Sequence, residues 1–216
     1  SVLLDDLEIR SENAVKIEGI LQIGVKMLLS SLLNDAQSSA IIFGTPTMIN
    51  TETFQNELFK KGVEEIRIIS QGCPDLATQI SNDPDSSFVE ERIRHWVQKA
   101  MLKLPEKYID TLLVFLACTH YGYRQDLFQK AFNEEGFCNI TLLNPNLAAA
   151  ENLVKTVSNN LNPSSTESKA FSVEFVTPYA IPEQEIITLT QLLSPISPAT
   201  ADALNNTRIY PELLNP

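Results

Sequence analysis

The sequence is poor in the residues that build metal sites, disulfide frameworks and nucleic-acid surfaces. Its 216 residues include three cysteines and two histidines, and no Cys-x-x-Cys pair occurs. This argues against a zinc site or a disulfide framework and favours free thiols in a reducing compartment. Lys+Arg is 16 and Asp+Glu is 27, which gives a formal net charge of -11 at pH 7. A phosphate-backbone binder needs a basic stripe, so we expect no nucleic-acid partner.

Long apolar segments are also missing. No apolar run reaches the roughly 18 residues that a membrane-spanning helix needs, and no basic-then-apolar leader opens the chain. We therefore expect no membrane partner and a cytoplasmic location.

Short apolar runs alternate with amphipathic segments along most of the chain. The strand-like runs are residues 20–23, 40–43, 65–69, 111–117, 140–143 and 171–176. Helical periodicity is clearest at 25–34, 53–61, 89–104, 126–133 and 148–160. This alternation predicts an α/β fold with a mostly parallel sheet, and the continuous apolar run at 111–117 is typical of a central strand covered on both faces. Residues 162–169 are polar and predict a loop, and the proline-rich tail after Pro178 predicts short helices and turns on a surface.

The segment Ala-Cys-Thr-His-Tyr at 117–121 is the richest in reactive groups. It directly follows the strand that we expect to be most buried, and ligands of α/β sheets bind just past the carboxyl ends of strands. His120 could lower the pKa of the Cys118 thiol or shuttle protons itself. The alternative is a buried cysteine that ends a strand, with His120 exposed on a loop.

A second segment, Phe-Gly-Thr-Pro-Thr at 43–47, also follows a predicted strand and precedes a helix. Backbone N–H groups at the helix start, together with the Thr45 and Thr47 hydroxyls, could hold a carboxylate or a phosphate. The alternative is an ordinary strand-to-helix turn with Thr47 or Thr51 as the N-cap.

A third segment, Gly-Cys-Pro-Asp at 72–75, contains a helix-start signal in its Pro-Asp pair. We expect Cys73 to be packed rather than reactive. His95, beside Trp96 in a predicted helix, is expected at the surface or its boundary, and we assign Cys138 no role.

Together these segments resemble the glutamate racemase family, within the aspartate/glutamate racemase superfamily. The family has a strand that ends in Leu-Gly-Cys-Thr-His-Tyr, an earlier Gly-Thr turn followed by Ser/Thr and an aromatic residue, and an Ala-Cys-Pro segment about midway. The corresponding residues here, in the same order, are Leu-Ala-Cys-Thr-His-Tyr at 116–121, Gly-Thr at 44–45 with Thr51 and Phe54, and Gly-Cys-Pro at 72–74. The resemblance covers roughly residues 4–151.

The resemblance implies racemisation of glutamate without a cofactor, with neither pyridoxal phosphate nor a metal. The family uses two cysteines on opposite faces of the Cα atom, one to abstract a proton and one to donate it. Cys118 matches the second of these, and His120 matches the histidine that assists it. Thr119 matches a substrate-binding position, and Thr45 and Thr47 are further candidates for binding the substrate. Such an enzyme would supply D-glutamate for peptidoglycan in the cytoplasm, as a homodimer acting on a small acidic amino acid.

The sequence also departs from the family pattern. The family's first catalytic cysteine lies in a Cys-Asn-Thr motif upstream of the region that matches residues 1–6, and neither it nor the family's Asp-Ser-Gly and Pro-Tyr-Gly segments is present. Ser81 and Asn82 stand where the family has a glutamate, and Met48 replaces a threonine. These differences leave two alternatives: an aspartate racemase-like enzyme, or a degenerate, non-catalytic member that binds a carboxylate or a protein.

We therefore expect a two-lobe aspartate/glutamate racemase-like fold, with parallel sheets flanked by helices and an incomplete first lobe. Residues 1–17 would be a remnant of that lobe, 18–144 a complete α/β lobe with the Cys-Thr-His-Tyr site, and 145–216 a segment returning to the first lobe. Such a chain would be a partial and inactive form. Without the first lobe, we expect the apolar side chains of the tail to form an exposed patch or to depend on a partner; these are Leu189, Leu192, Leu193, Ile196, Leu204 and Ile209.

Overall fold

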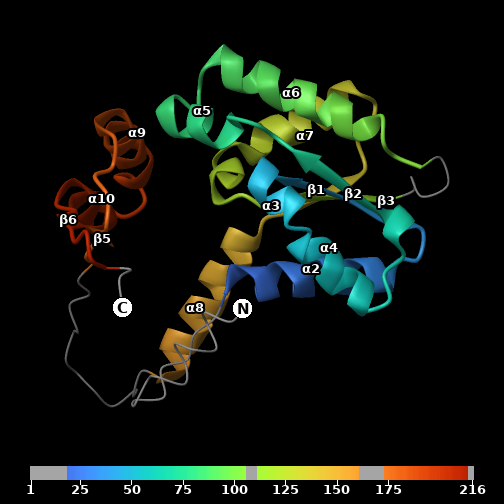
Figure 1. The fold of residues 1–216 in the computed structure, drawn as a ribbon, viewed down its shortest axis with the longest axis horizontal. Helices are drawn as coiled ribbons and strands as arrows, with labels where there is room; N and C mark the ends of the chain where they lie inside the picture. The colour runs from blue at the N-terminus through green and yellow to red at the C-terminus, as the bar shows by residue number, and fades with distance from the viewer. Residues whose placement is uncertain (1–18, 106–110, 161–172, 214–216) are drawn as a thin grey trace.

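The computed structural model describes residues 19–105, 111–160 and 173–213, drawn in colour in Figure 1. Helices and strands alternate through most of this range. In chain order the elements are α2 (Ile20–Asn34), β1 (Ser38–Gly44), α3 (Pro46–Asn50), α4 (Thr53–Lys60), the 3-10 turn η1 (Glu65–Arg67), β2 (Ile68–Gly72), α5 (Leu76–Asn82), α6 (Ser87–Met101), β3 (Thr111–Leu116), the 3-10 turn η2 (Thr119–Arg124), α7 (Gln125–Glu134), β4 (Ile140–Leu143), α8 (Pro145–Asn160), β5 (Val176–Thr177), α9 (Glu183–Leu193), α10 (Pro198–Asn205) and β6 (Arg208–Ile209).

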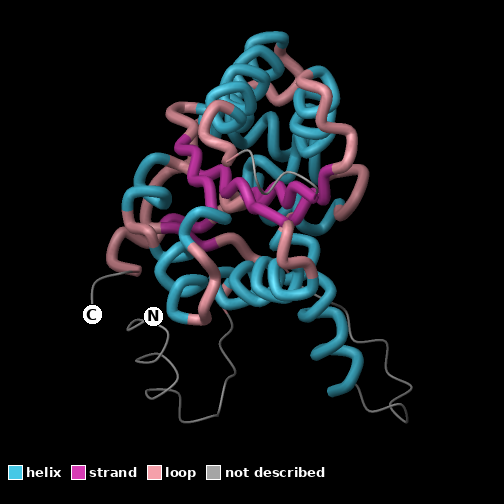
Figure 2. Tube along the Cα trace, turned by 90° about the vertical axis from the view of Figure 1, so that its right-hand side faces the viewer, coloured by secondary structure: helices cyan, strands magenta, loops and turns pink. Residues whose placement is uncertain are grey.

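The main body is a four-stranded parallel sheet in the order β2-β1-β3-β4. Helices α5, α6 and α7 cover one face, and α2 and α4 cover the other, with α8 packed beside α2 (Figure 1). The tube view in Figure 2 shows the same three layers edge-on, with the strands between the helices. The predicted α/β class and parallel sheet are confirmed.

Successive side chains of the central strands enter two separate cores, because side chains alternate between the faces of a sheet. Ile41 and Phe43 of β1 pack with α5, α6 and α7, whereas Ala40 and Ile42 pack with α2 and α4. All seven residues of β1 are buried. Burial on both faces explains why β1 and β3 read as continuous apolar runs.

One predicted strand is wrong: residues 20–23 form the first turn of α2. A short apolar run does not by itself distinguish a strand from a helix. The buried positions Val25, Leu28 and Leu32 have helical spacing, and Gly24 is also buried. A Cβ atom on Gly24 would lie 2.6 Å from Cζ of Phe115, so a residue without a side chain lets this helix approach the sheet closely.

Two further strand predictions are displaced. In the predicted strand 65–69, the first three residues form η1, and β2 runs on to Gly72. Of the predicted strand 171–176, residues 171–172 lie outside the described residues, 173–175 are in no strand, and Val176 begins β5, a two-residue strand that pairs in parallel with β6. The predicted loop 162–169 and the predicted remnant 1–17 lie outside the described residues.

The C-terminal elements α9, α10, β5 and β6 form a small unit beside α5 (Figure 1). Thr188 Oγ1 donates a 2.9 Å hydrogen bond to the Asn82 carbonyl at the end of α5. The predicted short helices of the proline-rich tail are confirmed. None of the helices in the described ranges combines the length and the apolar character that crossing a bilayer requires.

Candidate functional site

The three segments singled out from the sequence meet at one edge of the sheet. They follow β1, β2 and β3, whose carboxyl ends lie side by side in a parallel arrangement. The Ala117 N–H donates to the Phe43 carbonyl at 2.8 Å, and the Cys73 N–H donates to the Gly44 carbonyl at 2.8 Å. This is the edge at which ligands of open α/β sheets bind.

Cys118 lies where β3 ends and η2 begins, and its backbone is still extended. The side chain is half-buried against the core that contains Phe43. Its Sγ atom is 3.7 Å from Nδ1 of His120. A thiol and an imidazole at this separation can exchange a proton, which is the first requirement of the proposed acid–base chemistry.

The electrostatics of this thiol favour its neutral form. Burial raises the pKa of the Cys118 thiol above its ordinary value, and hydrogen bonds from the backbone N–H groups of His120 and Tyr121 offset part of that increase. The sequence suggested that His120 could lower the pKa of the Cys118 thiol, but the increase caused by burial is the dominant effect. Cys118 is therefore placed better to donate a proton at neutral pH than to hold a standing negative charge.

The three candidate threonines have different environments. Thr119 is exposed in the first turn of η2, and Thr47 is exposed in the first turn of α3. Thr45 is the N-cap of α3, since its Oγ1 accepts a 3.3 Å hydrogen bond from the Met48 N–H. The alternative caps Thr47 and Thr51 are wrong, because Thr51 lies at the other end of that helix. In the described part of the chain, neither Thr45 nor Thr47 reaches a hydrogen bond with Cys118 or His120.

Cys73 is packed, as expected. Its side chain is 1% exposed, and its Sγ atom lies 3.7 Å from the Gln71 carbonyl. Burial raises the pKa of the Cys73 thiol strongly, so it stays protonated. Cys138 is exposed. His95 is half-buried, with its ring centroid 4.7 Å from that of Trp96, which confirms its boundary position.

A buried tyrosine ties the turn after β3 to the turn after β2. Tyr121 is fully buried in the core, and its hydroxyl donates a 3.4 Å hydrogen bond to the Cys73 carbonyl. The backbone N–H of Tyr121 donates to the Cys118 carbonyl at 3.1 Å. Tyr121 therefore holds the backbone of the Cys118 turn against the neighbouring loop.

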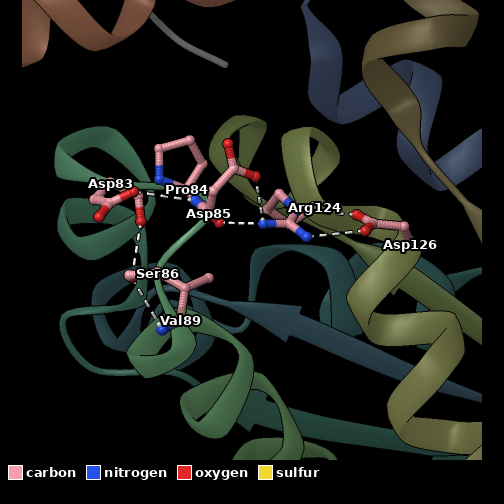
Figure 3. A network of polar contacts seen from close by, with 7 residues as sticks. All are labelled: Asp83, Pro84, Asp85, Ser86, Val89, Arg124 and Asp126. Atoms are coloured by element: carbon pink, nitrogen blue, oxygen red, sulfur yellow. Dashed lines mark hydrogen bonds and ion pairs between the residues drawn. The ribbon is translucent and has the colours of Figure 1, made fainter.

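The other end of η2 is fastened by Arg124, shown in Figure 3. Its guanidinium binds both carboxylate oxygens of Asp126 at 3.0 and 3.1 Å. It also donates to the carboxylate of Asp85 and to the carbonyl of Pro84, in the connection between α5 and α6. Arg124 thus joins three segments around the turn that bears Cys118. Sequence reasoning missed it, because a single arginine in a polar stretch carries no distinctive pattern.

Potential metal ligands do not cluster in the described ranges: no group of three or more His, Cys, Asp or Glu side chains is close enough to hold an ion.

Known proteins give these features a context. No family profile matches the chain. A curated glutamate racemase of Roseobacter denitrificans is 32% identical over 93 residues, which are 43% of this chain and 32% of that protein. The crystal structure of a glutamate racemase isoform of Bacillus anthracis aligns with a TM-score of 0.61 at 17% identity, over 89% of this chain and 64% of that one. A glutamate racemase of Francisella tularensis, solved in complex with D-glutamate, aligns with a TM-score of 0.59 at 19% identity, over 95% of this chain and 65% of that one.

These similarities show the fold. The chain has a fold similar to that of these glutamate racemases, with a parallel sheet flanked by helices. The chain spans less than two thirds of the length of these two solved racemases. Its aligned part spans about one third of the length of the curated relative.

Proposed function

We propose that this chain, which has the fold of glutamate racemases over its described residues, provides one of the two acid–base faces of an amino-acid racemase. The observation that carries the proposal is the pair Cys118 and His120 at the carboxyl end of β3, with Sγ and Nδ1 3.7 Å apart. The 32% identity to a curated glutamate racemase supports the same assignment.

The chemistry requires a proton to leave or reach the Cα atom of an amino acid. That proton is very weakly acidic, so the base must lie within hydrogen-bond reach and the developing carbanion must be stabilised. In the proposed step, Cys118 gives its proton to His120 Nδ1 and then abstracts the Cα proton as a thiolate. In the reverse direction, the Cys118 thiol donates its proton to the carbanion, and the raised pKa suits this role. Thiol and imidazole carry this proton transfer without a cofactor.

Substrate binding is proposed for Thr119, Thr45 and Thr47. Thr119 neighbours the reactive thiol in the chain, and Thr45 and Thr47 lie at the start of α3, directly after the adjacent strand β1. Hydroxyl and backbone N–H groups of these turns can hydrogen-bond the carboxylates of an acidic amino acid. The substrate proposed is glutamate, with D-glutamate for peptidoglycan as the product, in a cytoplasmic homodimer.

Inversion of the stereocentre needs a second acid on the opposite face. Of the three thiols in the described residues, Cys73 is buried, and Cys138 is exposed just before the amino end of β4, whereas the site lies at the carboxyl ends of the parallel strands. We therefore propose that this chain of 216 residues supports proton exchange on one face and does not by itself invert glutamate.

Aspartate is a less favoured substrate in this proposal. The aspartate alternative was motivated by Ser81 and Asn82, where the resemblance places a glutamate, and by Met48, where it places a threonine. In the structure Ser81 is buried and the Asn82 carbonyl is occupied by Thr188. Ser81 is thus held within the fold rather than presented to a ligand, whereas Asn82 is exposed and only its backbone carbonyl is engaged.

A second candidate, a non-catalytic binder of acidic amino acids, is favoured by the raised pKa of Cys118. A neutral thiol beside backbone N–H groups does not repel a carboxylate. Calorimetric titration with glutamate separates the two: a binder keeps its affinity in Cys118→Ala and never exchanges the Cα proton.

The proposed function is tested by deuterium exchange at the glutamate Cα atom, followed by proton NMR in D₂O. We expect Cys118→Ala to lower the exchange rate by about 10²-fold or more, the usual size of a general acid–base contribution. Cys138→Ala, which removes an exposed thiol, is the matched control and should exchange like the unmodified chain. Equal exchange in the two variants would contradict the proposal.

A further inference from the structure

Three side-chain amides cluster where β4 leads into α8. Asn144 is buried, and its Nδ2 atom donates a 3.1 Å hydrogen bond to Oε1 of Gln125. Its Oδ1 atom accepts a 3.1 Å hydrogen bond from the backbone N–H of Asn146. The Asn146 side chain in turn donates from Nδ2 to the carbonyl of Thr119, at 3.0 Å. The cluster therefore extends from the carboxyl end of β4 to Thr119, the residue after Cys118.

Close packing holds η2 against these amides. A Cβ atom on Gly122 would lie 2.8 Å from Nδ2 of Asn144 and 3.3 Å from Nδ2 of Asn146. Real Cβ atoms essentially never come as close as 2.8 Å, so a side chain at this position would have to displace the two amides. The turn and the amide cluster are therefore fitted to each other.

The bond to Thr119 acts on the reactive thiol through one rigid unit. The Thr119 carbonyl and the His120 N–H belong to the same planar peptide group, so fixing one fixes the direction of the other. Donation to the carbonyl also polarises the peptide and strengthens its N–H as a donor. The same peptide leads directly into His120, whose Nδ1 atom lies 3.7 Å from the Cys118 sulfur, and the backbone N–H of His120 is one of the groups that lower the pKa of the Cys118 thiol.

We propose that Asn146 is a positioning residue: by holding the Thr119 carbonyl, it fixes the peptide that places His120 beside the sulfur of Cys118. This inference rests on the proposed acid–base role of Cys118 and adds to it a residue that does not touch the substrate. The other titratable groups facing the thiol are His120 on its own turn, Tyr121, and Cys73 on the turn after β2. Substitution of Asn146 leaves all of these in place.

The test is the pH dependence of alkylation of Cys118 by iodoacetamide, read for each cysteine peptide by mass spectrometry in the full 216-residue chain. In Asn146→Ala we expect the midpoint of the alkylation profile to move up by roughly half to one pH unit, which is about threefold to tenfold less thiolate below the midpoint. Asn152→Ala, an exposed asparagine on the same helix, is the matched control and should keep the original midpoint. An equal midpoint in both variants overturns the proposal.

If Asn146→Ala loses its near-UV circular dichroism, its tertiary packing is disturbed and a second variant is used. Asn146→Asp keeps the shape of the side chain but cannot donate when it is ionised. In about 1 M salt, where the Debye length is about 3 Å, its added charge is largely screened. The midpoint must still rise if the lost donor is responsible, and an unchanged midpoint again overturns the proposal.

This assay separates the inference from the function on which it rests, because alkylation needs no substrate. A shifted midpoint in a chain that exchanges no glutamate proton supports the positioning role and contradicts the proposed function. Normal exchange with an unmoved midpoint contradicts the positioning role alone.

Discussion

At the scale of single residues, the three thiols of the chain lie in three different environments. Cys73 is 1% exposed, Cys118 is half-buried beside His120, and Cys138 is exposed. Thiol reactivity depends on both access and thiolate fraction. The environment therefore decides which thiol can do chemistry, and the sequence alone left Cys118 open between a reactive and a packed role.

We predict the order of alkylation at pH 8 from these environments. Cys138 should react first, because it is accessible. Cys118 should follow more slowly, because burial raises the pKa of its thiol, and Cys73 should react only when the chain unfolds. Peptide-resolved mass spectrometry over a time course checks the order, and rapid labelling of Cys73 in the folded chain would contradict the structure.

Cys73 also predicts a loss of stability at alkaline pH. Burial raises the pKa of this thiol in the folded chain, whereas in the unfolded chain it returns to about 8.5. Above that pH the unfolded state releases the proton and the folded state keeps it. Because of this group, the free energy of unfolding should then fall by about 1.4 kcal/mol per pH unit. The stabilising contribution of the neutral buried thiol is fully present below about pH 8.5 and is lost as the pH rises.

Urea unfolding between pH 7 and pH 10 measures this slope. Cys73→Ala should show a flatter dependence than the unmodified chain, whatever its absolute stability. The buried Tyr121, whose pKa burial also raises, adds a similar fall near pH 10 in both proteins. Parallel slopes in the two proteins would show that Cys73 is not protected from ionisation.

At the scale of elements, the turn η2 depends on residues far away in the sequence. Tyr121 bonds to the turn after β2, Asn146 reaches it from α8, and Arg124 ties it to the connection between α5 and α6. These contacts explain how a six-residue turn can hold a defined geometry around Cys118. None of them could be predicted from local sequence pattern, because each joins segments at least 25 residues apart.

Arg124→Ala should destabilise this anchoring by about 1–2 kcal/mol. The ion pairs with the exposed Asp85 and Asp126 contribute little of this. Most comes from leaving the carbonyl of the buried Pro84 without its charged donor. Hydrogen exchange of the η2 amides, compared with global urea unfolding, measures the effect.

Arg94→Ala is the matched control for this prediction. Arg94 pairs only with the carboxylates of Glu90 and Glu134 on the surface, according to its described contacts. Its removal should cost less than that of Arg124 and should leave the exchange of the η2 amides unchanged. Equal effects of the two substitutions would mean that Arg124 is an ordinary surface arginine.

At the scale of the whole molecule, the strands of the main sheet could be predicted from the sequence, whereas the strands of the C-terminal tail could not. Strands near 40–43 and 111–117 were found because parallel strands buried on both faces have continuous apolar runs. The strand at 140–143 was found from its short apolar run, although it lies at the sheet edge and only Leu143 in it is buried. The run at 20–23 gave a wrong strand because its helical spacing becomes visible only together with Val25, Leu28 and Leu32. In the described part of the predicted strand 171–176, residues 173–175 are not a strand, because two-residue strands such as β5 are set by their partner rather than by their own residues.

The predicted apolar patch of the tail is present in part. Ile196 is 82% exposed and Ile209 is exposed as well, whereas Leu204 of α10 is buried. A cavity of about 380 Å³ lies between Tyr123 and the tail and is lined mainly by apolar side chains, including Tyr179 and Leu189. The tail therefore has a small core of its own and still exposes apolar surface.

We predict that the chain binds the dye ANS through this surface. Combining Tyr179→Ser with Ile196→Ser should reduce ANS fluorescence at least twofold, since both side chains are largely exposed. Leu102→Ser is the control, because Leu102 is also largely exposed but lies at the end of α6 in the main body. ANS fluorescence at the level of a fully folded compact protein would contradict the prediction.

The most direct test of the central claim compares the two enantiomers of glutamate in D₂O. Each is incubated with the unmodified chain, Cα deuteration is followed by NMR, and chirality is followed by circular dichroism. One acid–base face predicts deuteration of a single enantiomer with retention of configuration and no change in optical activity. Exchange of neither enantiomer would contradict the claim that Cys118 acts on the Cα proton in this chain, and inversion would contradict the claim that the chain offers only one face.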